Sequence, residues 1–146
     1  MMKKLFLFLG ICLMMLAGCT SEAEKDSEAL KAAMAGGKTE DVAKLTSEMY
    51  AKKADCDAEN LAVLTAGYNY LAEKEMEGAN DPANLSDYIE KALECYDAAM
   101  KSDAESAKEA FEQLGKANIE KDLKELKSNL EQAQAAEQAL LEQING

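Results

Sequence analysis

Residues 57–76 read DAENLAVLTAGYNYLAEKEM and contain no proline. The spacing of a helix face, three or four residues, separates Leu61, Leu64, Tyr68 and Leu71. A second small or apolar set is interleaved with the first and consists of Val63, Ala66, Gly67 and Tyr70. Because a helix with such broad apolar coverage buries more than one face, we expect residues 57–76 to contact other helices on two sides.

The helical pattern continues on both sides of this segment. The chain is rich in Ala, Leu, Glu, Lys and Gln, which are good helix formers, and no segment alternates convincingly as a strand does. The expected helices cover about 21–36, 39–50, 57–76, 86–100, 102–115 and 119–144. Gly78 to Asn84 is expected to be a loop. The sequence therefore predicts an all-α fold of antiparallel helical hairpins with a long C-terminal amphipathic helix.

The C-terminal segment has the most regular apolar pattern in the chain. Steps of four and three residues connect Ile119, Leu123, Leu126, Leu130, Ala133, Glu137, Leu140 and Ile144, which matches a heptad repeat. One interpretation is a helix that covers the core of its own domain. The other is a docking helix for a partner, or a self-associating helix over residues 119–144, with Leu123, Leu126 and Leu130 as candidate partner-binding residues.

Two sets of small and aromatic residues resemble the tetratricopeptide repeat. The first-helix spacing of that repeat is matched by Val63, Ala66, Gly67 and Tyr70, and the second-helix spacing by Ala92, Tyr96, Ala99 and Ala104. The resemblance implies helical hairpins whose two helices approach closely at Gly and Ala. It also implies an inner surface that binds a protein or peptide, with Asn69 and Tyr70 as candidate contacts. An irregular helical bundle is the alternative arrangement.

The N-terminus has the pattern of a targeting segment. Lys3 and Lys4 precede an apolar run over residues 5–17, which is too short to cross a bilayer core of roughly 30 Å. The end of this run and the two residues after it, Leu16-Ala17-Gly18-Cys19, resemble the lipobox of bacterial lipoproteins. This resemblance implies that residues 1–18 are removed and that Cys19 is acylated. Residues 19–26 are then a short tether, which the first helix could also include, and residues 27–146 form one helical domain.

The lipobox resemblance also implies a location. Membrane lipid would hold the protein through the acyl chains on Cys19, in the bacterial cell envelope and facing the periplasm or the exterior. If the cell has two membranes, Thr20 after the cysteine favours the outer one.

Charge and composition exclude several classes of function. Residues 19–146 hold 14 of the 16 lysines and all 28 acidic residues, for a net charge of −14. Nucleic-acid binding is disfavoured because a phosphate backbone requires clustered basic residues. The chain has no His and no Arg, so it offers no serine–histidine pair and no imidazole metal site. We expect no enzymatic activity, no cofactor and no metal.

Two further patterns, one acidic and one of cysteines, do not by themselves define a calcium site or a disulfide. Asp55 and Asp57 begin like a calcium loop, but the sixth position is Asn60 rather than Gly. Outside the cytoplasm, Cys56 and Cys95 could form a disulfide. They could equally be two separately buried thiols.

These features favour a non-catalytic, lipid-anchored envelope protein that binds or scaffolds an unknown protein or peptide. The alternative is a structural or stress-related envelope lipoprotein that forms a closed bundle without a binding groove.

Overall fold

The computed structural model describes residues 22–78 and 81–146. In chain order the elements are α2 (Glu22–Ala35), α3 (Thr39–Ala51), the short 3-10 helix η1 (Lys53–Asp55), α4 (Ala58–Glu77), α5 (Pro82–Ser102), α6 (Ala104–Gln113) and α7 (Ile119–Asn145). No strand occurs in these two ranges, so the predicted all-α fold class is confirmed. None of the helices in the described ranges is long and apolar enough to cross a membrane. The leader and Cys19 lie outside the described residues.

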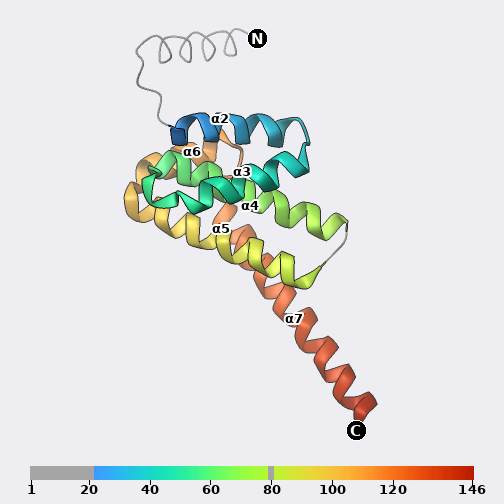
Figure 1. The fold of residues 1–146 in the computed structure, drawn as a ribbon. Helices are drawn as coiled ribbons and strands as arrows, with labels where there is room; N and C mark the ends of the chain where they lie inside the picture. Colours follow the sequence, from blue (N-terminus) through green and yellow to red (C-terminus); the bar gives the residue numbers. More distant parts are fainter. Residues whose placement is uncertain (1–21, 79–80) are drawn as a thin grey trace, which may run out of the picture.

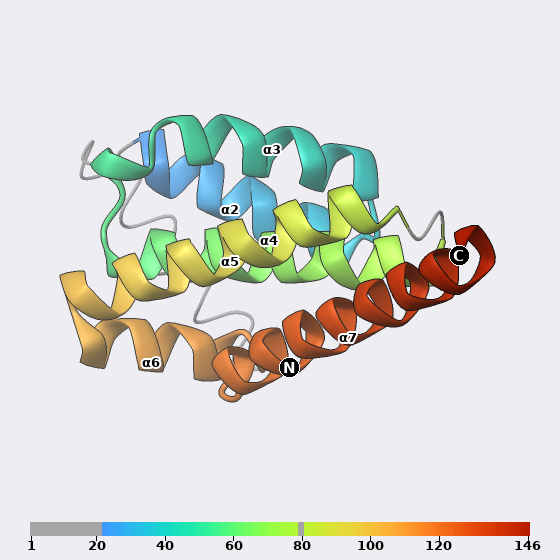
Figure 2. The ribbon, with the colours of Figure 1, turned by 90° about the horizontal axis from the view of Figure 1, so that it is seen from below.

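Helix α4 is the centre of the packing, as its two-sided apolar pattern predicted. Every residue from Leu61 to Asn69 is buried. The helix packs along α5 and also contacts α2, α3 and α6, so it has neighbours on several sides (Figures 1 and 2). The core around it includes Leu64, Leu71 and Phe111.

Aspartates begin three of the helices. Asp57 Oδ1 accepts a hydrogen bond of 2.9 Å from the Asn60 amide at the start of α4. Asp103 caps α6, which therefore begins at Ala104, two residues after the expected start at residue 102. Asp81 caps α5, where Pro82 follows in the first turn. Proline suits that position because its missing N–H would have no helical partner, so the predicted loop is shorter and α5 begins at Pro82 rather than at Ser86.

Gly67 lies at a close approach between helices. A Cβ atom there would lie 2.5 Å from Thr46 Cγ2 and 3.0 Å from Leu30 Cδ2. Thr46 belongs to α3 and Leu30 to α2. The resemblance to a helical hairpin implied that Gly67 would meet α5, the next helix of its own hairpin. Instead, its nearest neighbours belong to the preceding pair of helices.

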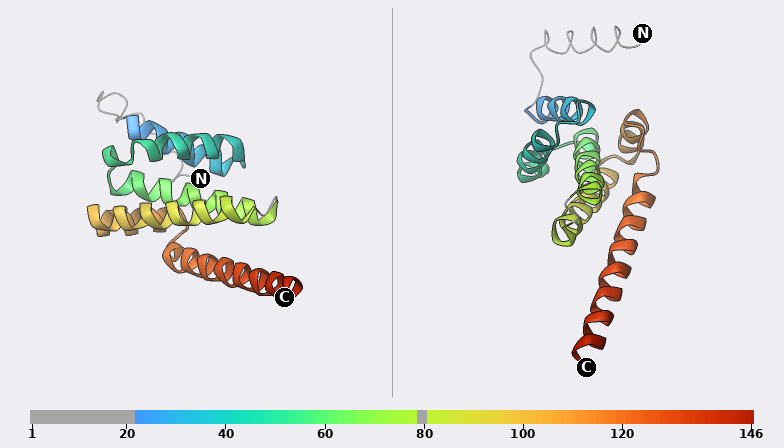
Figure 3. Two further views of the ribbon diagram at one scale, coloured as in Figure 1. Left: turned by 60° about the horizontal axis from the view of Figure 1, so that its bottom comes forward. Right: turned by 90° about the vertical axis from the view of Figure 1, so that its right-hand side faces the viewer.

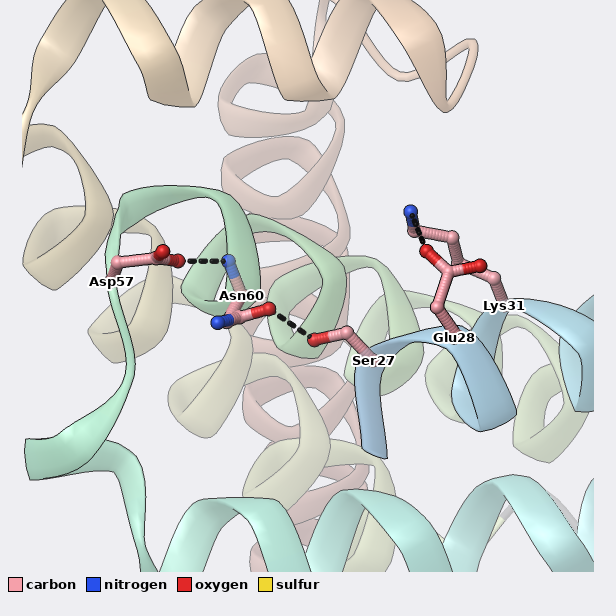
Figure 4. A network of polar contacts seen from close by, with 5 residues as sticks. All are labelled: Ser27, Glu28, Lys31, Asp57 and Asn60. Carbon is pink, nitrogen blue, oxygen red and sulfur yellow. Dashed lines mark hydrogen bonds and ion pairs between the residues drawn. The ribbon is translucent and has the colours of Figure 1, made fainter. Parts of the chain in front are cut away.

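Buried polar side chains also join α2 to α4. Ser27 Oγ donates a hydrogen bond of 2.6 Å to Asn60 Oδ1, while the backbone N–H of Asn60 donates to Asp57 Oδ1 (Figure 4). In the same view Lys31 pairs with Glu28 on the exposed side of α2. Since α2 begins at Glu22, residues 22–26 are helical turns. These residues therefore belong to the first helix and not to a tether.

Helix α7 divides into two halves. Ile119 and Leu123 are buried, and Leu126 and Leu130 pack against a small cluster formed by Ala72, Leu85 and Ile89. From residue 131 to the end, every residue is exposed, and the helix extends away from the other helices (Figures 1 and 3). The first half therefore covers the protein's own core, whereas the second half projects from it.

Candidate functional site

The predicted partner-binding residues do not form one surface. Leu123 is fully buried and belongs to the protein's own core, so its assignment as a partner contact was wrong. Leu126 and Leu130 are half-buried against α4 and α5. The Tyr70 hydroxyl lies 3.3 Å from Thr39 Oγ1, on the side of α4 that faces α3. Asn69 is only 1% exposed, but it lines a groove on another side of α4.

This groove lies between α4 and α7 and has a volume of about 400 Å³. It is lined by four carboxylates, two amides and two apolar side chains: Glu73, Glu77, Asp122, Glu125, Asn69, Asn129, Met76 and Leu126. We call it the acidic groove. Its volume falls within the range of roughly 300–1,000 Å³ that is typical of ligand pockets.

Asn69 is the buried residue in the lining of the acidic groove. Its Nδ2 donates a hydrogen bond of 3.1 Å to Glu73 Oε1, which determines the orientation of the amide. Asn69 Oδ1 has no hydrogen-bond partner among the described residues. Leaving a buried acceptor unpaired costs about 1–3 kcal/mol, so the position favours a bound group that donates a hydrogen bond.

The carboxylates of the acidic groove are only partly neutralised. Lysines at its edge pair with three of them, Lys116 with Glu73 at 3.4 Å, Lys74 with Glu77 at 3.2 Å and Lys121 with Glu125 at 3.8 Å. These pairs are exposed and screened by water, so each contributes little to stability. Asp122 forms no ion pair within the described residues. No lysine lines the groove itself.

Sequence reasoning missed most of the acidic groove. Asp122, Glu125 and Asn129 are spaced so that they share one face of a helix, and so are Glu73 and Glu77. That spacing was a usable signal for two polar faces. It could not show that α4 and α7 place the two faces opposite each other.

The second candidate surface is the projecting half of α7, residues 131–145, which we call the α7 tail. Three large apolar side chains are exposed on it: Leu140 at 59%, Leu141 at 52% and Ile144 at 76%. Its charged residues are Glu131, Glu137 and Glu142, and it has no lysine. The α7 tail therefore combines an apolar patch with a negative charge.

The tyrosines are packed mainly as structural residues. Tyr68 is buried, and its ring meets that of Tyr50 edge-on at a centroid distance of 5.8 Å. Lys53 Nζ lies 4.1 Å from the centre of the Tyr50 ring and pairs with Glu94, to which the Tyr50 hydroxyl also donates. Because these partners are already satisfied by one another, the cluster holds α3, α4 and α5 together.

Both cysteines of the domain are free thiols, so the structure contains no bridge between Cys56 and Cys95. Burial raises the pKa of Cys95 to about 12 and also raises the pKa of the half-buried Cys56. Thiolates are the reactive form, so neither cysteine has the environment of a nucleophile.

Within residues 22–78 and 81–146, no three acidic or cysteine side chains lie close enough together to hold a metal ion. No protein-family model matches the chain, and neither a curated protein nor a solved structure matches it.

Proposed function

We propose that this protein is a lipid-anchored, non-catalytic module of the bacterial cell envelope that holds a protein partner at the membrane. The observation that carries the proposal is the exposure of Leu140, Leu141 and Ile144 on a helix segment in which every residue is exposed. Clustered exposed apolar side chains are typical of interaction surfaces.

The spacing of these three residues suits one mode of recognition. Leu140 and Ile144 are four residues apart, and Leu141 and Ile144 are three apart, so all three share one face of the helix. Amphipathic helices that present anchors at these spacings dock into apolar grooves of partner proteins. The α7 tail would be inserted in this way into a groove of the partner.

The proposed attachment to the membrane is based on the lipobox-like segment that ends at Cys19. Only Thr20 and Ser21 separate Cys19 from Glu22, the first residue of α2. Because each residue spans at most roughly 3.5 Å, acyl chains on Cys19 would keep α2 within roughly 10 Å of the anchored residue. The α7 tail projects from the side of the body opposite α2 (Figure 1), so the partner would be held on the side of the protein that faces away from the anchored residue.

Site-specific cross-linking in intact envelopes tests the proposal. A photo-reactive residue at Leu141 should give one discrete heterologous product, whereas the same residue at Glu109 on α6 should not. The triple substitution Leu140→Gln, Leu141→Gln and Ile144→Gln should abolish that product while the thermal unfolding transition is unchanged. A product the size of two copies of the chain would indicate self-association instead. The absence of any product from Leu141 would favour a closed structural bundle and contradict the proposal.

A further inference from the structure

We propose that the acidic groove binds the cationic side chain of a lysine or arginine from a basic peptide segment. This inference goes beyond the α7 tail as a partner surface, since it concerns a different part of the molecule. Its occupant follows from the charge of the groove and from the unpaired side-chain oxygen of Asn69, a residue that lines it.

The hydrogen-bonding chemistry of the acidic groove is that of an acceptor for cations. A lysine ammonium or an arginine guanidinium has only N–H donors and no acceptor. Asn69 Oδ1 is buried, unpartnered and in need of a donor. Asp122 and Glu125 on α7 stand across the groove from it and supply the negative charge. A cation that reached Asn69 would therefore supply the missing donor, and the carboxylates that line the same groove would balance its charge.

The apolar lining suits a long side chain rather than a small ion. Met76, which is 49% exposed, and Leu126 contribute apolar atoms beside the carboxylates. The methylene stems of lysine and arginine pack on such surfaces while their charged ends bond to polar groups. A metal ion is a poorer fit, because no three carboxylates of the described residues converge on one point.

The protein's own lysines do not fill this role. Lys116, the lysine that pairs with Glu73, lies 3.4 Å from Glu73 Oε1 and forms no bond with Asn69. The strongly acidic body, with net charge −12 over the whole chain, also attracts a basic segment from a distance. The ligand class that remains is a basic peptide segment from another molecule.

Binding of a defined probe tests the inference. Fluorescein-labelled hexalysine is titrated with the full chain, purified from membranes in mild detergent, and followed by fluorescence anisotropy. Asp122→Asn with Glu125→Gln should weaken binding about tenfold, because two charge-assisted contacts are lost. The matched control is Glu109→Gln with Glu112→Gln, two carboxylates at the same spacing on α6, which should change affinity less than about twofold. Equal losses of affinity in the two double variants would mean that hexalysine is held by general charge attraction, which would overturn the assignment.

A second variant addresses the buried oxygen directly. Asn69→Leu removes the acceptor without changing the net charge, and it should weaken hexalysine binding by about tenfold. Unchanged binding by a folded Asn69→Leu variant would overturn the role of Asn69. Hexalysine with acetylated side chains should not bind. If spermidine bound as tightly as hexalysine and with the same dependence on Asp122 and Glu125, the occupant would be a free polyamine and the peptide assignment would be wrong.

The proposal for the α7 tail and the proposal for the acidic groove can be disproved independently of each other. The triple substitution in the α7 tail leaves the acidic groove intact and should bind hexalysine like the wild type. Loss of hexalysine binding in the Asp122 and Glu125 variant, by contrast, should leave cross-linking from Leu141 unaffected.

Discussion

Ser27 Oγ on α2 donates a hydrogen bond of 2.6 Å to Asn60 Oδ1 on α4, and both residues are buried. The bond joins residues that are 33 positions apart and holds the N-terminal helix against the central one. The close packing of Leu30 of α2 beside Gly67 of α4 also joins these two helices. The bond of Ser27 adds a directional contact that favours one register of α2 on α4.

Substitution Ser27→Ala should lower the free energy of unfolding by about 1–3 kcal/mol, because it leaves Asn60 Oδ1 buried without a donor. Urea unfolding followed by circular dichroism measures the loss. Ser47 is exposed on α3, so Ser47→Ala is the matched control and should have little effect. Equal losses for the two serines would contradict a specific role of the buried bond.

Substitution Gly67→Ala should destabilise the protein by about 1–3 kcal/mol, because the new methyl group overlaps Thr46 Cγ2 at 2.5 Å. Thr46→Ser removes that methyl group and keeps the hydroxyl that bonds to the Val42 carbonyl. The double variant should therefore recover part of the lost melting temperature. Gly78→Ala is the control, since among the described residues its Cβ would meet only the Lys74 carbonyl, at 3.4 Å. A double variant that is no more stable than Gly67→Ala would argue against this close contact.

Removing residues 131–146 should leave the melting temperature nearly unchanged, because all of these residues are exposed. Removing residues 118–146 should unfold or strongly destabilise the rest, since Ile119 and Leu123 would leave the core. At single positions, Leu123→Ala should cost about 2–5 kcal/mol, and Leu140→Ala far less. Thermal unfolding by circular dichroism separates the two halves of α7. Equal costs at Leu123 and Leu140 would mean that the α7 tail folds back on the body in solution.

Stability should decrease at alkaline pH through Cys95. Burial raises the pKa of this thiol from its usual value of 9.0 to about 12. Between those values the unfolded chain releases a proton that the folded chain keeps, so stability that is fully present below pH 9.0 is lost as the pH rises toward 12. Urea unfolding on both sides of pH 9.0 measures the slope, and Cys95→Ala should reduce it. Some slope should persist, because burial also raises the pKa of Tyr68.

Alkylation of the thiols provides an independent check on their burial. Iodoacetamide should label the half-buried Cys56 in the folded protein and Cys95 only at the rate of unfolding. Rapid labelling of Cys95 in the native state would show that its environment is open.

Substitution Cys19→Ala should abolish lipid attachment, because the thiol would be the acyl acceptor of the lipobox-like segment. Metabolic labelling with a fatty-acid analogue, followed by fractionation of the cell envelope, measures the change. Cys56→Ala is the matched control and should incorporate label like the wild type. Equal labelling of the wild type and Cys19→Ala would exclude acylation at this residue.

The central position of α4 could be predicted from the sequence, because apolar residues on several faces of one helix require several neighbours. The start of α5 was also readable, since Asp81 and Pro82 are a cap and a first-turn proline; the prediction failed because Pro82 was assigned to a loop. Helix formation depends on local spacing and capping, which neighbouring residues specify.

The sequence could not show where α7 leaves the body or which residues face the acidic groove. Leu123 and Leu140 occupy equivalent positions in one regular pattern, yet one is fully buried and the other 59% exposed. Periodicity reports which face of a helix is apolar, but burial also requires another element opposite that face. Here the C-terminal part of α4 and the N-terminal part of α5 lie beside the first half of α7. The same pattern therefore becomes core at Leu123 and open surface at Leu140. Asn69 lines a groove for the same reason: packing between helices far apart in the chain, rather than local spacing, determines its surroundings.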